Sequence, residues 1–458
     1  MALLTCPIAC QAKQTPDAIA VYLSDQTLSY RQLDRRINAI QLQLQQQNIH
    51  SDEHLMLTAT NSLELILLLW ACWRERIVAC PINPAFPPEQ LNELYLRTHA
   101  CAWWPQLLTF NFSQELSGKE HQILDTEILS NLISTSGSSG QPKLVAHQLK
   151  QHLANAQGSL VPIHSNDCWL LSLPLYHVGG IAILFRCFLV GASIALPDPK
   201  QSLSQQLTDC PITHLSLVPT QLYRLLKQSN FHFSQTHIKH LLLGGAPIPD
   251  TLVAQCQQQG LTPWVSYGLS EMASQVCTTT ASMSGLVGHP LPKRELTIQQ
   301  GEICVKGETL FAGYYQPDKT LRLPLDEQGW FHTRDTGHWH EEGLVIDGRL
   351  DNQFISGGEN IQPEFIEQVL IQHPAIAQAI VVPQSHPEWG QQVVCYVDWH
   401  DMPTNAETLK DWLQGKLARF QIPKAVYDWP ELPAGQLKIS RQFFKNLAAE
   451  TKNPAKRD

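Results

Sequence analysis

Short apolar segments that end in turn-forming residues recur along the first two thirds of the chain. Examples are HLMLTAT at 54–60, HLSLVPT at 214–220 and HLLLGGAP at 240–247, separated by segments long enough for helices. One such segment, 28–48, has the period of an amphipathic helix behind the capping residue Ser29. Runs of this kind are typical of strands buried in a parallel sheet, whose ligands bind at the carboxyl ends of the strands. The chain is therefore predicted to be an α/β protein.

The pattern changes after Gly301. GEICVKGETL, which begins there, and GLVIDGRL at 343–350 are turn-bounded and alternate apolar with polar residues, which predicts a small antiparallel, β-barrel-like part. A linker-like GRLDNQ follows, and the rest of the chain has a smaller β/α rhythm, with a helix expected near 406–419. We therefore predict a large N-terminal domain, residues 1–350, made of doubly wound α/β subdomains plus the barrel-like part. A small, mobile α+β domain, residues 351–458, is expected to follow.

Bulk composition limits the class of partner. The 458 residues are 43% apolar and carry a formal net charge of −9, which argues against a nucleic-acid binder. The 12 cysteines are scattered without a CxxC pair, which favours free thiols in a reducing cytoplasm. The most apolar stretch, Leu63–Cys72, contains Glu64 and is too short to span a bilayer, and no basic export signal begins the chain. We expect a cytoplasmic protein without stable membrane insertion, and a homo-oligomer is left open.

The segment STSGSSGQPKLVAH, residues 134–147, is rich in glycine and hydroxyl side chains and follows the apolar ILSNLI. Backbone N–H groups and hydroxyls of such a loop can surround phosphates, while Lys143 supplies positive charge. It is not a Walker A loop, because Pro142 rather than glycine precedes the lysine. The alternative is a flexible Gly/Ser linker.

This loop resembles the phosphate loop of the adenylate-forming superfamily, which includes acyl-CoA synthetases, peptide-synthetase adenylation domains and luciferases. The match runs from Thr135 to Lys143. The resemblance implies that ATP is bound here by Thr135, Ser136, Gly137, Ser138, Ser139, Gly140 and Lys143.

Two further segments resemble the family's motifs in the family's order. HLLLGGAPI at 240–248 resembles the turn whose backbone, around Gly245 and Ala246, approaches adenine, with a plain strand-ending turn as the alternative. VSYGLSEMAS at 265–274 resembles the motif YGxTE. There the resemblance implies that Tyr267 stacks on adenine, Ser270 touches phosphate and Glu271 helps to hold Mg²⁺, with an ordinary helix start as the alternative. The same segment is expected to contribute Gly268 to both the ATP and acid sites and Leu269 to the acid site.

The last matches lie on both sides of the predicted domain boundary. WFHTRDTGHW at 330–339 resembles a segment that usually reads TGD, so that Asp335 would bind ribose while Arg334 stands in the place of the glycine. GRLDNQFISGGENIQPEFIE at 348–367 is a close match, in which Arg349 would bind ribose or phosphate and Asp351 would be the hinge between domains. LPAGQLKISR at 432–441 matches the lysine motif. The resemblance implies that Gly357, Gly358 and Glu359 form a loop that faces CoA. It also implies that Lys438 is the catalytic lysine.

These matches imply an ATP-dependent carboxylate–CoA ligase that works in two steps through an acyl-adenylate. Mg²⁺ would be the cofactor, ATP and CoA the co-substrates, and Lys438, Lys143 and Glu271 the catalytic groups. The resemblance further implies that the small C-terminal domain rotates between the two half-reactions.

The acid substrate is indicated by SLPLYHVGGIAILFRCFLVGASIAL at 172–196, whose wording resembles the o-succinylbenzoate–CoA ligases of menaquinone (vitamin K2) biosynthesis. That acid has a second, aromatic carboxylate, for which Arg186 would be a bidentate partner; the alternative is an arginine that snorkels to the surface. His177 would line or gate the acyl channel, or cap the helix. The competing functions are a ligase for another acyl or aryl acid, a stand-alone adenylation enzyme that loads a carrier protein, and a non-catalytic nucleotide sensor.

Overall fold

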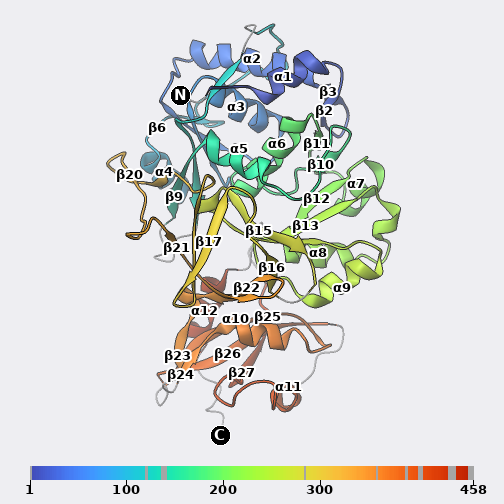
Figure 1. Cartoon of the computed structure of the whole chain (residues 1–458), viewed down its shortest axis with the longest axis vertical. Coiled ribbons are helices and arrows are strands. Elements are labelled where there is room, and N and C mark those ends of the chain that lie inside the picture. The colour runs from blue at the N-terminus through green and yellow to red at the C-terminus, as the bar shows by residue number, and fades with distance from the viewer. Residues whose placement is uncertain are drawn as a thin grey trace.

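The computed structural model describes residues 3–118, 122–135, 142–282, 285–356, 359–386, 390–400, 406–431 and 440–451. Two large sheets that are mainly parallel form most of the molecule (Figure 1). The first has, in spatial order, β15 (Ser274–Thr280), β14 (Trp264–Leu269), β13 (His240–Gly244), β12 (His214–Leu217), β10 (Cys168–Leu170), β11 (Ser193–Ala195), β2 (Ile19–Tyr22) and β3 (Thr27–Ser29). Neighbouring strands from β14 to β2 are parallel, and β15 and β3 add antiparallel edges.

The second sheet has a parallel half and an antiparallel half. Its strands are, in spatial order, β20 (Leu321–Arg322), β19 (Gly313–Tyr315), β9 (Lys143–Gln148), β8 (Leu129–Thr135), β5 (Val78–Ile82), β4 (His54–Thr58) and β6 (Ala100–Trp104). The pairs among β8, β5, β4 and β6 are parallel, whereas β8–β9, β9–β19 and β19–β20 are antiparallel. The three apolar runs that predicted strands are thus β4, β12 and β13, so this prediction is confirmed. A short antiparallel pair, β1 (Leu3–Thr5) and β7 (Ile123–Asp125), lies outside both sheets.

Alternate side chains of these strands enter different cores, because successive residues of a strand point to opposite faces. In β13, Leu242 belongs to the main hydrophobic cluster, and Leu241 and Leu243 belong to the one on the other face. The main cluster joins both sheets to α1 (Pro7–Gln14), α2 (Tyr30–Gln46), α3 (Leu63–Arg74), α5 (Leu149–Gln157) and α6 (Val178–Val190). The outer faces are covered by α4 (Pro88–Arg97) on one sheet and by α7 (Leu203–Asp209), α8 (Pro219–Leu226) and α9 (Asp250–Gln258) on the other. The predicted doubly wound architecture is confirmed.

Helix α3 shows why an apolar stretch became a buried helix. Its N-terminus is capped by Ser62, whose side chain accepts a hydrogen bond from the Leu65 N–H, and Glu64 lies in the first turn, near the positive end of the helix dipole. Trp70 is fully buried against Phe185 of α6, with ring centroids 5.4 Å apart. None of the helices in the described ranges combines the length and the hydropathy that a membrane span requires.

An antiparallel sheet follows, as the alternating pattern after Gly301 predicted. Its spatial order is β16 (Leu286–Gly288), β22 (Gly343–Arg349), β21 (Phe331–His340), β18 (Glu302–Gly307) and β17 (Arg294–Gln299). It lies between the parallel sheets and the C-terminal part of the chain (Figure 1).

The C-terminal part is a small α+β unit at one end of the molecule (Figure 1). Its strands are β23 (Phe354–Ser356), β24 (Glu359–Ile361), β25 (Ile376–His386), β26 (Gly390–Trp399) and β27 (Ala425–Asp428). Its helices are α10 (Pro363–Leu370), α11 (Ala406–Leu413) and α12 (Arg441–Glu450). Such a small unit after the large N-terminal part is the arrangement predicted; its boundary at residue 351 and its mobility stay predictions.

Candidate active site

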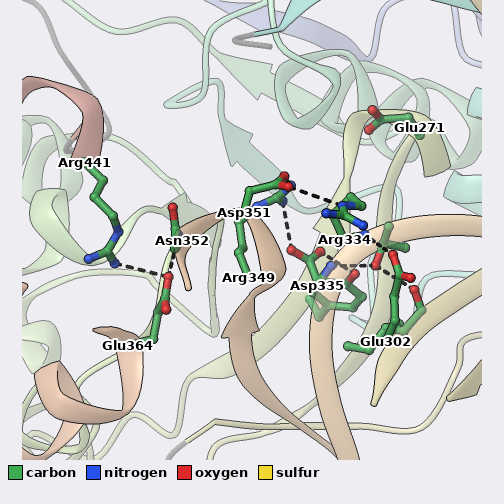
Figure 2. A network of polar contacts seen from close by, with 12 residues as sticks. Glu271, Glu302, Arg334, Asp335, Arg349, Asp351, Asn352, Glu364 and Arg441 are labelled. Carbon is green, nitrogen blue, oxygen red and sulfur yellow. Dashed lines mark hydrogen bonds and ion pairs between the residues drawn. The ribbon is translucent and has the colours of Figure 1, made fainter. Parts of the chain in front are cut away.

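Three predicted nucleotide-binding residues form one chain of polar contacts. The Tyr267 hydroxyl on β14 donates to Oδ2 of Asp335 on β21, at 2.7 Å. Nη1 of Arg349, on the neighbouring strand β22, donates to Oδ1 of Asp335 at 2.8 Å (Figure 2). Burial raises the pKa of Asp335, while Arg349 and the Tyr267 hydroxyl oppose that rise. These two donors hold the carboxylate in one orientation, and its binding to ribose stays a prediction.

A second group joins Glu271 to Lys143. Tyr314 of β19 donates its hydroxyl hydrogen to Oε1 of Glu271 at 2.7 Å, and the Lys143 ammonium lies 4.8 Å from the centroid of the Tyr314 ring. Burial raises the pKa of Tyr314, so its hydroxyl stays a donor. Tyr314 is a site residue that the sequence analysis missed, because nothing in its local pattern marks it.

Glu271 is the residue that could hold a magnesium ion. In the described part of the chain, no group of three or more His, Cys, Asp or Glu side chains has the arrangement of a metal site. A lone carboxylate fits Mg²⁺, because this ion usually takes one or two carboxylates and keeps waters and substrate phosphates as its other ligands.

Glu271 lies in the one-turn 3₁₀ helix Ser270–Met272 and Tyr267 in a strand, so the helix-start alternative is wrong for Tyr267.

His147 fixes the turn that carries Ser270 and Glu271. Its Nε2–H donates to the Ser270 carbonyl oxygen at 2.7 Å, and its Nδ1 accepts from the Asn131 amide at 3.3 Å. Burial lowers the pKa of His147 to about 4, so the ring is neutral. The turn that carries the predicted Mg²⁺ ligand is therefore held to β9 by a partly buried hydrogen bond.

The predicted phosphate loop connects two paired strands. Thr135 ends β8, Lys143 begins β9, and these two residues face each other across the antiparallel pair. Ser136, Gly137, Ser138, Ser139 and Gly140 lie outside the described residues, as do Gly357, Gly358 and Lys438.

Two glycines of the predicted site have backbone positions that need glycine. Gly245 follows β13 with a φ of 81°, in the left-handed region, and so makes the turn in which Ala246 also lies. A Cβ on Gly268 would lie 2.1 Å from the carbonyl oxygen of Ser274, where β14 meets β15 at a bulge. Both glycines have a structural reason, and their contacts with ATP stay predictions.

Arg186 is buried, so the alternative of a side chain that snorkels to the surface is wrong. It lies on α6 with 3% of its surface exposed, and its Nη2 donates to Oδ1 of Asn155 at 3.1 Å and to Oε1 of Gln275. Gln275 lies opposite Gly268 across the β14–β15 pair, and its neighbour Ser274 lies opposite Leu269. The structure thus brings Arg186 close to the two predicted acid-site residues of β14.

His177 lies at the other end of α6. Arg186 is nine positions further along the chain, which is about 13 Å along a helix. His177 occupies the N-cap position, but its side chain makes no capping hydrogen bond, so the capping alternative is not supported. Its ring packs against Tyr176, with centroids 4.9 Å apart. A role in the acyl channel stays a prediction.

The predicted hinge residue Asp351 is held between two arginines. Nε of Arg334 lies 3.2 Å from its Oδ1, and Nη2 of Arg349 lies 3.3 Å from its Oδ2 (Figure 2). Arg334 has a φ of 65°, a conformation that favours glycine, at the position where the resemblance would place glycine. Its N–H donates to Oε1 of Glu302 at 2.9 Å.

Beyond Asp351 the contacts continue into the C-terminal unit. The Asn352 side-chain amide donates to Oε1 of Glu364 on α10, and Nη2 of Arg441 on α12 donates to the same oxygen at 3.2 Å (Figure 2). Arg441 is the last residue of the predicted lysine motif, so this contact anchors the end of the segment that carries Lys438. Glu359 lies on β24 and is exposed.

Comparisons with known proteins find similarity over nearly the whole chain. Residues 8–104 and 96–315 match the AMP-binding enzyme family, and residues 365–436 match the AMP-binding enzyme C-terminal domain. The 2-succinylbenzoate–CoA ligase of Escherichia coli (strain K12) is 39% identical over 442 residues, which are 94% of this chain and 95% of that relative.

Two solved structures are similar over nearly the whole chain. An arginine-to-lysine variant of E. coli MenE with bound OSB-AMS has a TM-score of 0.88 at 34% identity, covering 98% of this chain and 100% of that chain. O-succinylbenzoate coenzyme A synthetase (MenE) from Bacillus subtilis, in complex with ATP and magnesium ion, has a TM-score of 0.83 at 26% identity. The match to it covers 94% of this chain and 97% of that chain.

Proposed function

The chain belongs to the AMP-binding enzyme family, and from this premise we propose that it is an acid–thiol ligase that joins 2-succinylbenzoate to CoA. In the first half-reaction a carboxylate oxygen of the acid attacks the α-phosphorus of ATP, which gives the acyl-adenylate and releases diphosphate. In the second, the CoA sulfur attacks the acyl carbon, which gives the thioester and releases AMP. The product belongs to menaquinone biosynthesis.

The first half-reaction brings two anions together, and this chain's cations reduce their repulsion. Lys143 stands at the base of the phosphate loop, and Lys438 is proposed to contact the reacting carboxylate and the α-phosphate. Glu271 would hold Mg²⁺, which supplies further positive charge against the phosphates. Charges that are already in place before the reaction stabilise the developing transition state most strongly.

The remaining polar groups orient the nucleotide. Asp335, which Tyr267 and Arg349 hold in place, is proposed to accept hydrogen bonds from the ribose hydroxyls. Ser270 and the backbone at Gly245 and Ala246 are proposed to contact phosphate and adenine.

The second half-reaction is assigned to the C-terminal unit. We place the domain boundary at residue 351 and propose that rotation about Asp351 removes Lys438 and brings Gly357, Gly358 and Glu359 to the CoA side. The cytoplasm is the proposed location, and a homo-oligomer stays a prediction.

The choice of acid is supported most directly by the surroundings of Arg186. This arginine is buried and its Nη2 is bonded to two neutral amides, so its positive charge has no bonded carboxylate within the described part of the chain. A buried unpaired charge is costly. A substrate with a second carboxylate would offset that cost, whereas benzoate or a fatty acid would not. 2-Succinylbenzoate has this second carboxylate on its ring.

Diphosphate release from ATP and Mg²⁺ tests the proposal, measured with 2-succinylbenzoate, benzoate and octanoate, each with and without CoA. We expect release and CoA-thioester formation with 2-succinylbenzoate only. Thioester formation with a control acid alone would refute the substrate and keep the ligase mechanism. Diphosphate release from ATP in the presence of 2-succinylbenzoate, without formation of a CoA thioester, would refute the ligase activity. It would favour an enzyme that loads a carrier protein.

The role of Arg186 has its own test. Arg186→Ala is expected to raise the KM for 2-succinylbenzoate and to leave the KM for ATP unchanged. An unchanged KM for the acid would refute the carboxylate contact.

A further inference from the structure

A second buried arginine, Arg294, lies beside Arg186. Arg294 begins β17 and is 6% exposed. Its Nε donates to the Gln275 carbonyl oxygen at 2.8 Å, and its Nη2 donates to the Asn155 carbonyl oxygen at 3.1 Å. Its Nη1 donates to the Pro292 carbonyl oxygen at 2.6 Å. Arg294 therefore fixes the main chain of the same two residues whose side chains hold Arg186.

The two amide side chains are oriented with their oxygens toward Arg186. Nδ2 of Asn155 donates to the Gln275 carbonyl oxygen at 3.2 Å, which leaves Oδ1 for Arg186. Nε2 of Gln275 donates to Oγ1 of Thr278 at 2.6 Å, which leaves Oε1 for Arg186. A guanidinium has only donors, so an amide side chain can bind it only through its oxygen. The contacts of the two NH₂ groups therefore select the amide orientations in which Asn155 and Gln275 accept hydrogen bonds from Arg186.

The charge of Arg186 is held without being cancelled. In the part of the chain that the structure describes, neither Arg186 nor Arg294 has a carboxylate partner, and Nε of Arg186 is buried with no hydrogen-bond partner. Burial and the nearby charge of Arg294 together lower the pKa of Arg186 to about 9, and burial lowers the pKa of Arg294 to about 10. Two buried cations that repel each other attract an anion.

We infer that Arg294 is a positioning residue of the acid site, which holds Asn155 and Gln275 so that their neutral amides orient Arg186 with its charge uncancelled. This inference rests on the proposed function, because it gives Arg186 the ring carboxylate as its ligand. Arg294 acts through its neighbours and determines how strongly the site prefers an acid with a second carboxylate.

Gly158 has no side chain at the position where the Arg294 guanidinium packs. It follows α5 as the C-cap residue, and a Cβ placed on it would lie 2.2 Å from Nη1 of Arg294 and 2.6 Å from the Pro292 carbonyl oxygen. Gly158→Ala would therefore displace the Arg294 guanidinium without changing any charge.

The test is the ratio of kcat/KM for 2-succinylbenzoate to that for 4-oxo-4-phenylbutanoate, which lacks the ring carboxylate, at saturating ATP and CoA. Arg294→Lys and Gly158→Ala are each expected to lower this ratio by about tenfold, because a small displacement of a positioning group is costly. The KM for ATP is expected to stay unchanged. Gln275→Glu is expected to lower the ratio too, because its carboxylate would cancel the charge of Arg186.

Arg74→Lys is the matched control. Arg74 is also a buried arginine, but it pairs with Asp34 at 2.6 Å, in contact with Cys6 and Asn38. This variant is expected to leave the ratio unchanged. An equally lowered ratio in Arg74→Lys and Arg294→Lys would indicate general destabilisation and overturn the inference.

The outcomes separate the inference from the proposed function. If the unmodified protein shows no preference for the acid with the ring carboxylate, the proposed function fails and the inference fails with it. If that preference is present and folded Gly158→Ala and Gln275→Glu keep the ratio within about twofold, only the inference is overturned. Gly158→Ala keeps the test decisive if Arg294→Lys does not fold.

Discussion

Arg334 is held in a backbone conformation that glycine adopts more easily, which makes Arg334→Gly an informative perturbation. Its φ is 65°, and a left-handed conformation costs a residue with a Cβ about 1–2 kcal/mol. Glycine removes that cost, but it also increases the entropy of the unfolded chain, which offsets about 0.4–1 kcal/mol. The substitution also removes the ion pair with Asp351, in which the two side chains are 56% and 24% exposed. Pairs this exposed contribute about 0–1 kcal/mol.

The matched variant is Arg334→Ala, which loses the same ion pair and keeps the strained backbone. The ion pair cancels in the comparison, so the difference between the two variants is the strain less the entropy of the glycine. We therefore expect Arg334→Gly to be more stable than Arg334→Ala by about 0.5–1 kcal/mol. Relative to the unmodified protein, we expect Arg334→Gly to be within about 1 kcal/mol and Arg334→Ala to be less stable by up to about 1 kcal/mol.

Equilibrium urea unfolding of the three proteins, followed by tryptophan fluorescence, measures these differences as shifts of the midpoint at constant slope. If the alanine variant is as stable as the glycine variant, the backbone at position 334 is not strained and the reasoning is wrong.

Four further perturbations test other parts of the protein. Burial holds the folded-state pKa of both His147 and His214 at about 4, below their ordinary 6.5, so the unfolded chain takes up protons first as the pH falls. The free energy of unfolding is therefore expected to have its full value above pH 6.5. Between pH 6.5 and 4 it should fall by up to about 1.4 kcal/mol per pH unit for each histidine. Urea unfolding of His147→Gln at several pH values should show a smaller fall. Trp70→Ala empties a fully buried site and is expected to lower the free energy of unfolding by about 3–5 kcal/mol, and a change below about 1 kcal/mol in urea unfolding would contradict its place in the core. Asp351→Pro is expected to permit diphosphate release and block thioester formation, and Lys438→Ala to reduce adenylation far more than thioester formation. With each half-reaction measured separately, full ligase turnover in the first variant, or equal losses in the second, would refute these roles.

The local elements were predictable because their signals are local. The capping box of α2 is made by Ser29 and Gln32, three residues apart, and the predicted helix at 28–48 is observed at Tyr30–Gln46. Alternation after Gly301 predicted antiparallel strands, and apolar runs predicted the parallel ones. The expected helix near 406–419 is shorter in the structure, at Ala406–Leu413, because helix ends depend on contacts that period does not record.

The fold class, the order of the motifs and the chemical type of each predicted site residue could be inferred from the amino-acid sequence, because periodicity, turn residues and short motifs are local features of the chain. Which polar groups contact one another became clear only from the folded chain. Tyr314 contacts Glu271, and Arg294 reaches the main chain of Asn155 and Gln275, across separations of 19 to 139 residues along the chain. Such partners are selected by strand register and by the need of buried polar groups for hydrogen bonds, and neither leaves a local signal in the sequence.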